Sequence, residues 1–349
     1  MKKDVIHLFS LCMFLGMISC NSANKASNSN EINEKFKVVG YFLPAPQGKS
    51  TVASISYQYL TSINYSFAKP AADNSGNLMP LPNPDTLHAL VRNAHSHEVE
   101  VFISVGGFGV GDGPGIDTRF EVLANTERTR INFAHSVMQM IRQFDLDGAD
   151  IDWEFPDAVE PSMSNFVALM KVLGDSLHPA GKKLTIAVES HHLPYTYGID
   201  EKVFDIVDWI NIMGYDNEGV GSHRPHQLTA HAPYWLSIIS FDHWLNERGL
   251  PKNKAVMGVP FYGKGTNRSY HPYRTLLANG ADPYADVAYS DTGVIYTGID
   301  GYFYMGIKTM QRATKLAQKR GAGVMIWEIS SDTTGKYSLL KAINDAVNE

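Results

Sequence analysis

Three acidic residues at alternate positions, Asp150, Asp152 and Glu154, form the stretch of the sequence best suited to chemistry. Side chains of a β-strand alternate between its two faces, so these carboxyl groups would share one face and Trp153 would point to the other. Carboxylates crowded on a buried face cannot all ionise without a large Coulomb penalty, so we expect the row to share protons. A carboxyl group that stays protonated near neutral pH is suited to general acid catalysis.

Two non-catalytic interpretations compete with this one. A solvated acidic loop is disfavoured because Leu146, Ile151 and Trp153 are apolar and the acidic spacing is strictly alternate. A calcium-binding EF-hand loop requires Gly at position 6 and Glu at position 12. Counted from Asp145, the Gly falls at position 4 and the Glu at position 10, so the calcium pattern fails. Asp147, at the start of the run, is more readily explained as a structural hydrogen-bond acceptor than as a catalytic group.

Residues 147–154, with the sequence DGADIDWE, resemble the DGxDxDWE signature of glycoside hydrolase family 18, which contains chitinases and endo-β-N-acetylglucosaminidases. Residues 104–107 (SVGG) are similar to the SxGG motif of that family, and residues 213–216 (MGYD) to its MxYD motif. Trp327 lies where the family keeps a tryptophan under the sugar of the −1 subsite, and Tyr41, Phe67 and Tyr262 also match. The matches run from about residue 37 to the last predicted strand.

This resemblance implies a retaining, substrate-assisted hydrolysis of β-1,4-linked N-acetylglucosamine, as in chitin or chitooligosaccharides. Glu154 would be the general acid and base, Asp152 would hold the acetamido N–H and share a proton with Asp150 or Glu154, and Tyr215 would donate to the acetamido oxygen. The implied substrate-binding residues are Tyr41, Phe67, Gly107, Trp153, Met213, Asp216, Tyr262 and Trp327.

Two other functions stay open. An endo-β-N-acetylglucosaminidase that cleaves the chitobiose core of N-glycans would use the same catalytic residues. A non-catalytic glycan-binding protein is the alternative from another class, although such members of the family usually lose the acid, and Glu154 is present here. His191 and Glu189, near the end of a predicted strand, are weaker candidates for lining the cleft.

Eight apolar segments read as strands, and amphipathic helices or loops separate them. They comprise the acidic strand together with 37–42, 62–68, 99–104, 184–188, 207–213, 255–261 and 323–327. Predicted helices include one that starts at Pro84 and one over 234–248. Apolar strands joined by crossovers predict a parallel sheet, and their number in one domain predicts an α/β fold, the (β/α)8 TIM barrel. A doubly wound sheet is disfavoured because no Gly-rich phosphate loop follows the first strand. Residues 264–301 are too few for the full α+β insertion that many processive chitinases carry after strand seven.

The first 20 residues read as a lipoprotein-type signal peptide. Lys2 and Lys3 precede a short apolar run that ends at Cys20, the expected site of lipidation. Residues 21–36 read as a flexible tether and 37–349 as the hydrolase domain. We therefore expect an exported protein that a lipid at Cys20 anchors to a bacterial membrane, at the outer membrane or cell surface rather than freely secreted.

Composition limits the remaining partners. The 349 residues carry a formal net charge of −6 and no basic cluster, so no nucleic-acid partner is expected. No HExxH spacing occurs among the histidines, which include His191, His192, His223, His226 and His231, so no metal site is predicted. No cofactor is implied, and we expect a monomer. The role of the histidines stays open.

Overall fold

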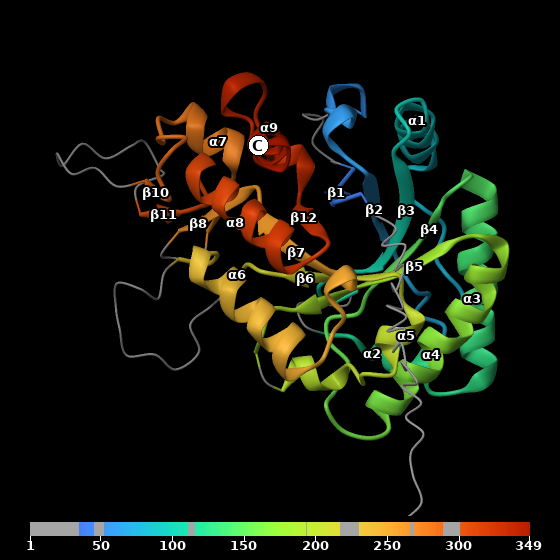
Figure 1. The fold of residues 1–349 in the computed structure, drawn as a ribbon. Coiled ribbons are helices and arrows are strands. Elements are labelled where there is room, and N and C mark those ends of the chain that lie inside the picture. Colours follow the sequence, from blue (N-terminus) through green and yellow to red (C-terminus); the bar gives the residue numbers. More distant parts are fainter. Residues whose placement is uncertain are drawn as a thin grey trace, which may run out of the picture. The chain divides into compact units, whose positions relative to one another are not determined.

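Eight strands of the structure, a computed structural model, form one parallel sheet that closes on itself (Figure 1). They are β1 (Lys37–Phe42), β2 (Ser62–Ala68), β3 (Glu100–Gly106), β4 (Gly148–Asp152), β5 (Lys183–Glu189), β6 (Trp209–Met213), β7 (Ala255–Pro260) and β12 (Gly323–Trp327). Around the barrel they follow the order β1-β12-β7-β6-β5-β4-β3-β2. This arrangement is the predicted (β/α)8 barrel, and that prediction is confirmed.

The structure describes residues 35–44, 52–110, 116–192, 194–216, 230–265, 269–288 and 301–349. Phe36–Glu349 form a compact unit that contains the whole barrel. The predicted signal peptide (1–20), its Cys20 and nearly all of the tether (21–36) lie outside the described residues. In the described part of the chain, no helix is long and apolar enough to cross a membrane.

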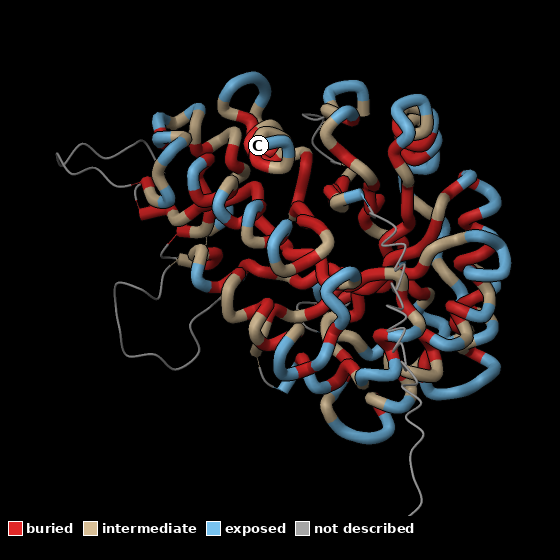
Figure 2. Tube along the Cα trace, in the orientation of Figure 1, coloured by how far each residue is buried: buried red, intermediate tan, exposed pale blue. Residues whose placement is uncertain are grey.

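Helices surround the strands, and their buried faces pack toward the barrel while their outer faces are exposed (Figure 2). The helices around the barrel are α1 (Pro84–His95), α2 (Thr118–Ala124), α3 (Glu127–Phe144), α4 (Ser162–Leu177), α5 (Val203–Ile206), α6 (Tyr234–Phe241), α8 (Ile307–Arg320) and α9 (Leu339–Asn348). Single 3-10 turns occur at Val52–Ser54, Tyr57–Tyr59, His178–Ala180, Tyr195–Gly198, Lys252–Lys254, Ile329–Ser331 and Gly335–Tyr337.

Helix α3 leads directly into the acidic strand β4. It begins at the N-cap Thr126, whose hydroxyl accepts a hydrogen bond from the backbone N–H of Thr129. It ends at Asp145, a C-cap in the left-handed conformation with a φ of 57°. Asp147 then accepts 2.8 Å hydrogen bonds from the backbone N–H of Val101 and from His95 Nε2. The expected structural role of Asp147 is thus confirmed, because it fixes the entry of β4 beside β3.

The register of the strands decides which side chains meet inside the barrel. Asp150 pairs with Ser104 of β3 on one side and with Thr185 of β5 on the other. Residues paired across neighbouring strands point to the same face of the sheet, so Ser104, Asp150 and Thr185 all face the barrel interior. The next inward residue of β4 is Asp152, which lies beside Gly106. The acidic row therefore runs along the inside of the barrel toward the carboxyl ends of the strands.

A small antiparallel sheet follows β7, and the sequence did not predict it. Its strands are β8 (Tyr262–Gly265), β9 (Tyr270–Pro272), β10 (Val287–Ala288) and β11 (Tyr302–Phe303), in the order β10-β11-β8-β9, and α7 (Tyr273–Ala278) follows β9. Strands this short leave no periodic pattern to recognise. The insertion is small, in keeping with the prediction that no full α+β domain follows strand seven.

Two other boundaries differ from the sequence prediction. Strand β6 starts at Trp209 rather than at residue 207, because the helical turn α5 and its C-cap Val207 precede it. The predicted helix over 234–248 is divided into α6 and a π-helical turn, η5 (Asp242–Glu247). Helix α2 was not predicted at all.

Candidate active site

Asp150 lies fully buried at the base of the acidic row and accepts hydrogen bonds from side chains of several strands. Tyr41 Oη and Ser104 Oγ donate to Oδ2 at 2.7 and 2.8 Å, and Thr185 Oγ1 and Asn211 Nδ2 donate to Oδ1 at 2.7 and 3.1 Å. Burial raises the pKa of Asp150, and the hydrogen bonds from Thr185, Tyr41, Ser104 and Asn211 oppose that rise. Donors on both carboxylate oxygens favour the ionised form of this residue.

Asp152 and Glu154 come next in the row and hold a proton between them. Burial, followed by the charges of Glu154 and Asp150, raises the pKa of Asp152 well above its usual range. Burial, followed by the charges of Glu189 and Asp216, raises the pKa of Glu154 to about 8, although a hydrogen bond with Asp152 opposes the rise. At pH 7 the pair therefore keeps at least one proton, as a general acid requires.

An aromatic floor, made of Trp327, Tyr41 and Phe67, lies on the β12, β1 and β2 side of the row. The Trp327 ring stacks on Phe67 at 5.7 Å between centroids and contacts Tyr41 at 5.6 Å. Gly107, with a φ of 85°, leaves room for Phe67, since a Cβ there would lie 2.8 Å from Phe67 Cε2. The backbone N–H of Gly107 donates 2.9 Å to the carbonyl oxygen of Asp152. The SVGG segment thus ties the floor to the acidic strand.

Tyr215 follows β6 and is nearly buried. Its hydroxyl lies 3.7 Å from Met325 Sδ. Burial, followed by the charges of Asp152 and Glu154, raises the pKa of Tyr215 well above its usual range. The phenol therefore stays protonated and remains a hydrogen-bond donor beside the acidic pair.

Asp216 is held by two side chains of β8 and by His231, which precedes α6. Tyr262 Oη donates to Asp216 Oδ1, Lys264 Nζ lies 2.9 Å from the same oxygen, and His231 Nδ1 lies 3.3 Å away. Burial alone would raise the pKa of Asp216, but His231, Lys264 and Tyr262 together lower it to about 2. Asp216 is therefore a fixed negative charge at neutral pH, and it contributes to the raised pKa of Glu154.

Trp153 is placed differently from the other predicted substrate-binding residues. Its ring stacks on Phe120 of α2 at 5.1 Å and meets Phe166 of α4, and its Nε1–H donates 2.7 Å to Asp117 Oδ2. Only 1% of Trp153 is exposed. The alternation of the strand turns it to the helix side of the barrel, so its expected contact with substrate is corrected to a packing role.

Three of the histidines that the sequence analysis names, His191, His192 and His231, lie in two polar clusters. His231 is buried against Tyr262 and beside Asp216. His191 and His192 follow β5 with their rings 4.3 Å apart, and His192 Nδ1 lies 2.8 Å from Glu189 Oε1. His223 and His226 lie outside the described residues. Among the residues that the structure covers, no cluster of His, Cys, Asp and Glu has the arrangement of a metal site.

Several residues around the acidic row were not predicted as site residues. Ser104, Thr185 and Asn211 bind Asp150, and Lys264 binds Asp216. Glu189, a weaker candidate from the sequence, acts on Glu154 through its charge. Polar residues at inward positions of otherwise apolar strands were the available signal for Thr185 and Asn211. No comparable signal marks Lys264, because the small sheet that carries it was not predicted.

A (β/α)8 barrel with a protonated carboxyl pair beside an aromatic floor has the architecture of a glycoside hydrolase. The model of Glycosyl hydrolases family 18 matches residues 37–332. The chain belongs to family 18 of the glycosyl hydrolases.

Two relatives are similar to this chain over most of its length. Endochitinase 1 of Metarhizium robertsii is 28% identical over 280 residues, which are 70% of this chain and 64% of that protein. Chitinase A1 of Niallia circulans is 28% identical over 335 residues, which are 76% of this chain and 47% of that protein. The chain thus matches only about half to two thirds of the length of these relatives.

Solved structures share the fold over nearly the whole barrel. The family 18 chitinase ChiB from the chitin utilization locus of Flavobacterium johnsoniae is 25% identical, with a TM-score of 0.72 over 90% of this chain and 94% of that one. A chitinase of Bacteroides thetaiotaomicron is 24% identical, with a TM-score of 0.74 over 90% and 96%. A chitinase-like agglutinin of Robinia pseudoacacia, 21% identical with a TM-score of 0.72 over 88% and 98%, has the same fold. The fold alone therefore does not decide between cleavage and binding.

Proposed function

We propose that this protein hydrolyses β-1,4-linked N-acetylglucosamine, as in chitin or its oligosaccharides, with retention of configuration and Glu154 as general acid and base. The observation that carries the proposal is the state of Glu154, whose raised pKa of about 8 keeps a proton available at neutral pH. The position of the pair at the mouth of the barrel, where such folds carry their active sites, supports it.

In the first step the glycosidic bond is broken. Glu154 gives its proton to the glycosidic oxygen, and the leaving sugar departs with that proton. The carbonyl oxygen of the 2-acetamido group on the retained sugar bonds to the anomeric carbon as the glycosidic bond breaks, which gives a cyclic oxazolinium ion. Asp152 accepts a hydrogen bond from the acetamido N–H and stabilises the positive charge, and Tyr215 donates to the acetamido oxygen.

The second step regenerates the site. Glu154, now ionised, takes a proton from water, and the water oxygen bonds to the anomeric carbon as the oxazolinium ring opens. Two inversions at that carbon give net retention. Trp327 and Phe67, which are partly exposed, form an apolar surface on which the retained sugar rests, and Tyr41 is buried against Trp327. The pyranose ring presents C–H groups to such a surface, so the floor suits a sugar without using its hydroxyls.

Two alternatives use the same residues differently. An endo-β-N-acetylglucosaminidase acting on N-glycans would need the same acid, and only the loops around the cleft would distinguish it. The relatives are named chitinases, which favours chitin. A glycan-binding protein without activity is disfavoured because Glu154, Asp152 and Tyr215 are all in place.

We also propose that the protein is exported and anchored by a lipid at Cys20, with residues 21–36 as a tether. The signal-like segment that ends at Cys20 supports this placement. Metabolic labelling with a fatty acid, compared between the wild type and Cys20→Ala, tests it, and equal labelling of both proteins contradicts it.

The substrate is tested with the Phe36–Glu349 unit, incubated in parallel with N-acetylglucosamine oligomers and with a high-mannose glycoprotein. Mass spectrometry reads the products. Shortened oligomers with an intact glycoprotein support the chitinase. A released glycan that leaves one sugar on the asparagine supports the endo-β-N-acetylglucosaminidase. Binding without either product supports the glycan-binding protein.

A further inference from the structure

Glu189 is the last residue of β5, which is the neighbour of β4 in the barrel. The register of β4 and β5 pairs Asp150 with Thr185 and Ile151 with Ile186, and Glu154 and Glu189 each follow three residues further along their own segment. Glu189 faces the same side as Thr185, whose hydroxyl contacts Asp150 inside the barrel. On its other side Glu189 pairs with Met213 of β6. Glu189 therefore ends β5 on the inner side of the barrel, close enough to Glu154 for its charge to act on that residue.

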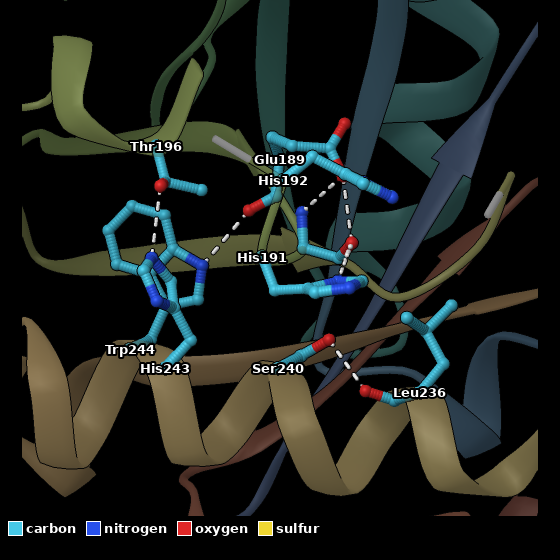
Figure 3. A network of polar contacts seen from close by, with 9 residues as sticks. Glu189, His191, His192, Thr196, Leu236, Ser240, His243 and Trp244 are labelled. Atoms are coloured by element: carbon cyan, nitrogen blue, oxygen red, sulfur yellow. Dashed lines mark hydrogen bonds and ion pairs between the residues drawn. The ribbon is translucent and has the colours of Figure 1, made fainter. Parts of the chain in front are cut away.

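The carboxylate of Glu189 is held in place by its own strand end. Ser190 donates to Oε1 from its backbone N–H at 2.8 Å and from Oγ at 2.7 Å, and His192 Nδ1 lies 2.8 Å from the same oxygen (Figure 3). The carbonyl oxygen of Glu189 accepts a 2.9 Å hydrogen bond from Trp244 Nε1, which anchors the strand end to η5. Only 17% of the Glu189 side chain is exposed. A carboxylate fixed in this way keeps a constant position and direction.

Histidine side chains lie near the end of β5 that carries Glu189 (Figure 3). Burial, followed by the charge of His192, lowers the pKa of His191 to about 4, so His191 is neutral at pH 7. His243 of η5 binds Glu247 and Thr196 at 2.8 and 3.0 Å instead. His192 reaches Glu189 through Nδ1, which lies 2.8 Å from Oε1.

We propose that Glu189 is a positioning residue for the general acid: its fixed carboxylate, on the strand next to Glu154, keeps the proton on Glu154 and so sets the alkaline limit of turnover. This inference rests on the proposed role of Glu154. Two nearby carboxylates disfavour each other's ionisation, so a negative charge on Glu189 favours the protonated form of Glu154. The charges that act on Glu154 are those of Glu189 and, after β6, Asp216, while Asp152 forms a hydrogen bond with it that opposes the rise. Glu189 is the contribution from the end of β5.

Glu189 differs from a substrate-binding group in what its loss should change. A carboxylate that only contacts sugar would affect KM and leave the ionisation of Glu154 alone. A carboxylate that acts on the acid would move the ionisation of Glu154 even in the absence of sugar. The free protein therefore provides the decisive measurement.

The test is a titration of the full chain with ¹³C-labelled glutamate side chains, followed by NMR. The Glu154 resonance is identified by its loss in Glu154→Gln. In Glu189→Gln we expect the apparent pKa of Glu154 to fall by about one pH unit, because one neighbouring charge is removed. Glu247→Gln is the matched control: it removes a carboxylate that contacts His243 and, with 63% of its side chain exposed, lies in solvent. It should leave the titration unchanged.

A second variant and a kinetic pH profile complete the test. Glu189→Asp retains the charge and should titrate closer to the wild type than Glu189→Gln does, which separates charge from packing. The pH profile of kcat/KM on an N-acetylglucosamine tetramer should show its alkaline limb displaced in Glu189→Gln in the same direction. An unchanged Glu154 titration in Glu189→Gln overturns the inference, even if the enzyme cleaves the tetramer normally. A protein that cleaves no such oligomer contradicts the proposed function, and the NMR titration still decides the role of Glu189.

Discussion

Tyr41 Oη donates a 2.7 Å hydrogen bond to Asp150 Oδ2, which connects strands that are not neighbours in the barrel. Strands β2 and β3 lie between β1, which carries Tyr41, and β4, which carries Asp150. Ser104 on β3, Thr185 on β5 and Asn211 on β6 complete the contacts of this carboxylate. Side chains from several strands thus hold one buried charge at the base of the acidic row, and each of them has a predicted cost when removed.

Replacing Tyr41 with Phe removes a hydrogen bond to a buried carboxylate. We expect the free energy of unfolding to fall by about 1.5–3 kcal/mol, the range for hydrogen bonds to charged groups. We also expect kcat/KM to fall, because Asp150 would hold a proton more readily and compete with Asp152 for it. Denaturant unfolding and kinetics on an N-acetylglucosamine tetramer measure the two effects.

Tyr57→Phe is the matched control for that change. The Tyr57 hydroxyl donates 2.8 Å to the neutral carbonyl oxygen of Val52, away from the acidic row. Its loss should cost about 0.5–1.5 kcal/mol and leave kcat/KM unchanged. Equal effects of the two variants on kcat/KM would contradict the special role of the Tyr41–Asp150 bond.

Replacing Gly107 with Ala places a methyl group against Phe67. The added Cβ would lie 2.8 Å from the ring, in a backbone with a φ of 85°. We expect a loss of stability greater than the roughly 1–2 kcal/mol of left-handed strain alone. Binding of N-acetylglucosamine oligomers should weaken as well, because the Phe67 ring belongs to the aromatic floor.

Gly335→Ala separates strain from contact. Gly335 has a φ of 76° and nothing within 4 Å of an added Cβ. This variant should show the left-handed strain and keep full affinity for the oligomers. Thermal unfolding and calorimetric binding compare the two glycines, and equal losses in both variants count against a close Phe67 contact.

The raised pKa of Glu154 also predicts how stability depends on pH. An unfolded Glu titrates near 4.3, whereas Glu154 in the folded protein titrates at about 8. Between these values the folded state binds more protons than the unfolded one, so the contribution of Glu154 to stability is full below pH 4.3 and declines up to about pH 8. Asp152, whose pKa is also raised, acts in the same direction.

The Glu154→Gln variant lacks this dependence. Its free energy of unfolding, relative to that of the wild type, should rise between pH 5 and pH 8, as measured by urea unfolding at both pH values. A difference that stays constant across this range would mean that Glu154 is not protonated in the folded protein at neutral pH.

Much of the barrel could be predicted from local patterns, because its strands are apolar segments separated by crossovers. The alternation of Asp150, Asp152 and Glu154 also predicted a buried row that shares protons. The same alternation already turned Trp153 to the opposite face, and the structure shows it packed among Phe120 and Phe166. Its assignment to the substrate came from the family motif and not from the geometry of the strand.

The parts of the site that the sequence did not predict depend on contacts between segments far apart in the chain. Which residues surround Asp150 depends on the register between strands, and the pattern within a single strand does not contain it. Lys264 reaches Asp216 only because a four-residue strand pairs with partners of two and three residues in the small sheet. Such short strands are stabilised by tertiary packing, which a local sequence window does not reveal.

The central claim is that Glu154 is the general acid and base, and Glu154→Gln tests it most directly. Turnover of an N-acetylglucosamine tetramer and calorimetric binding of the same oligomer are measured side by side, with Glu160→Gln, an exposed carboxylate nearby, as the control. We predict that Glu154→Gln loses at least about 10²–10⁴-fold in kcat while it binds the tetramer within a few-fold of the wild type, and that Glu160→Gln behaves as the wild type. Turnover that survives in Glu154→Gln would contradict the account.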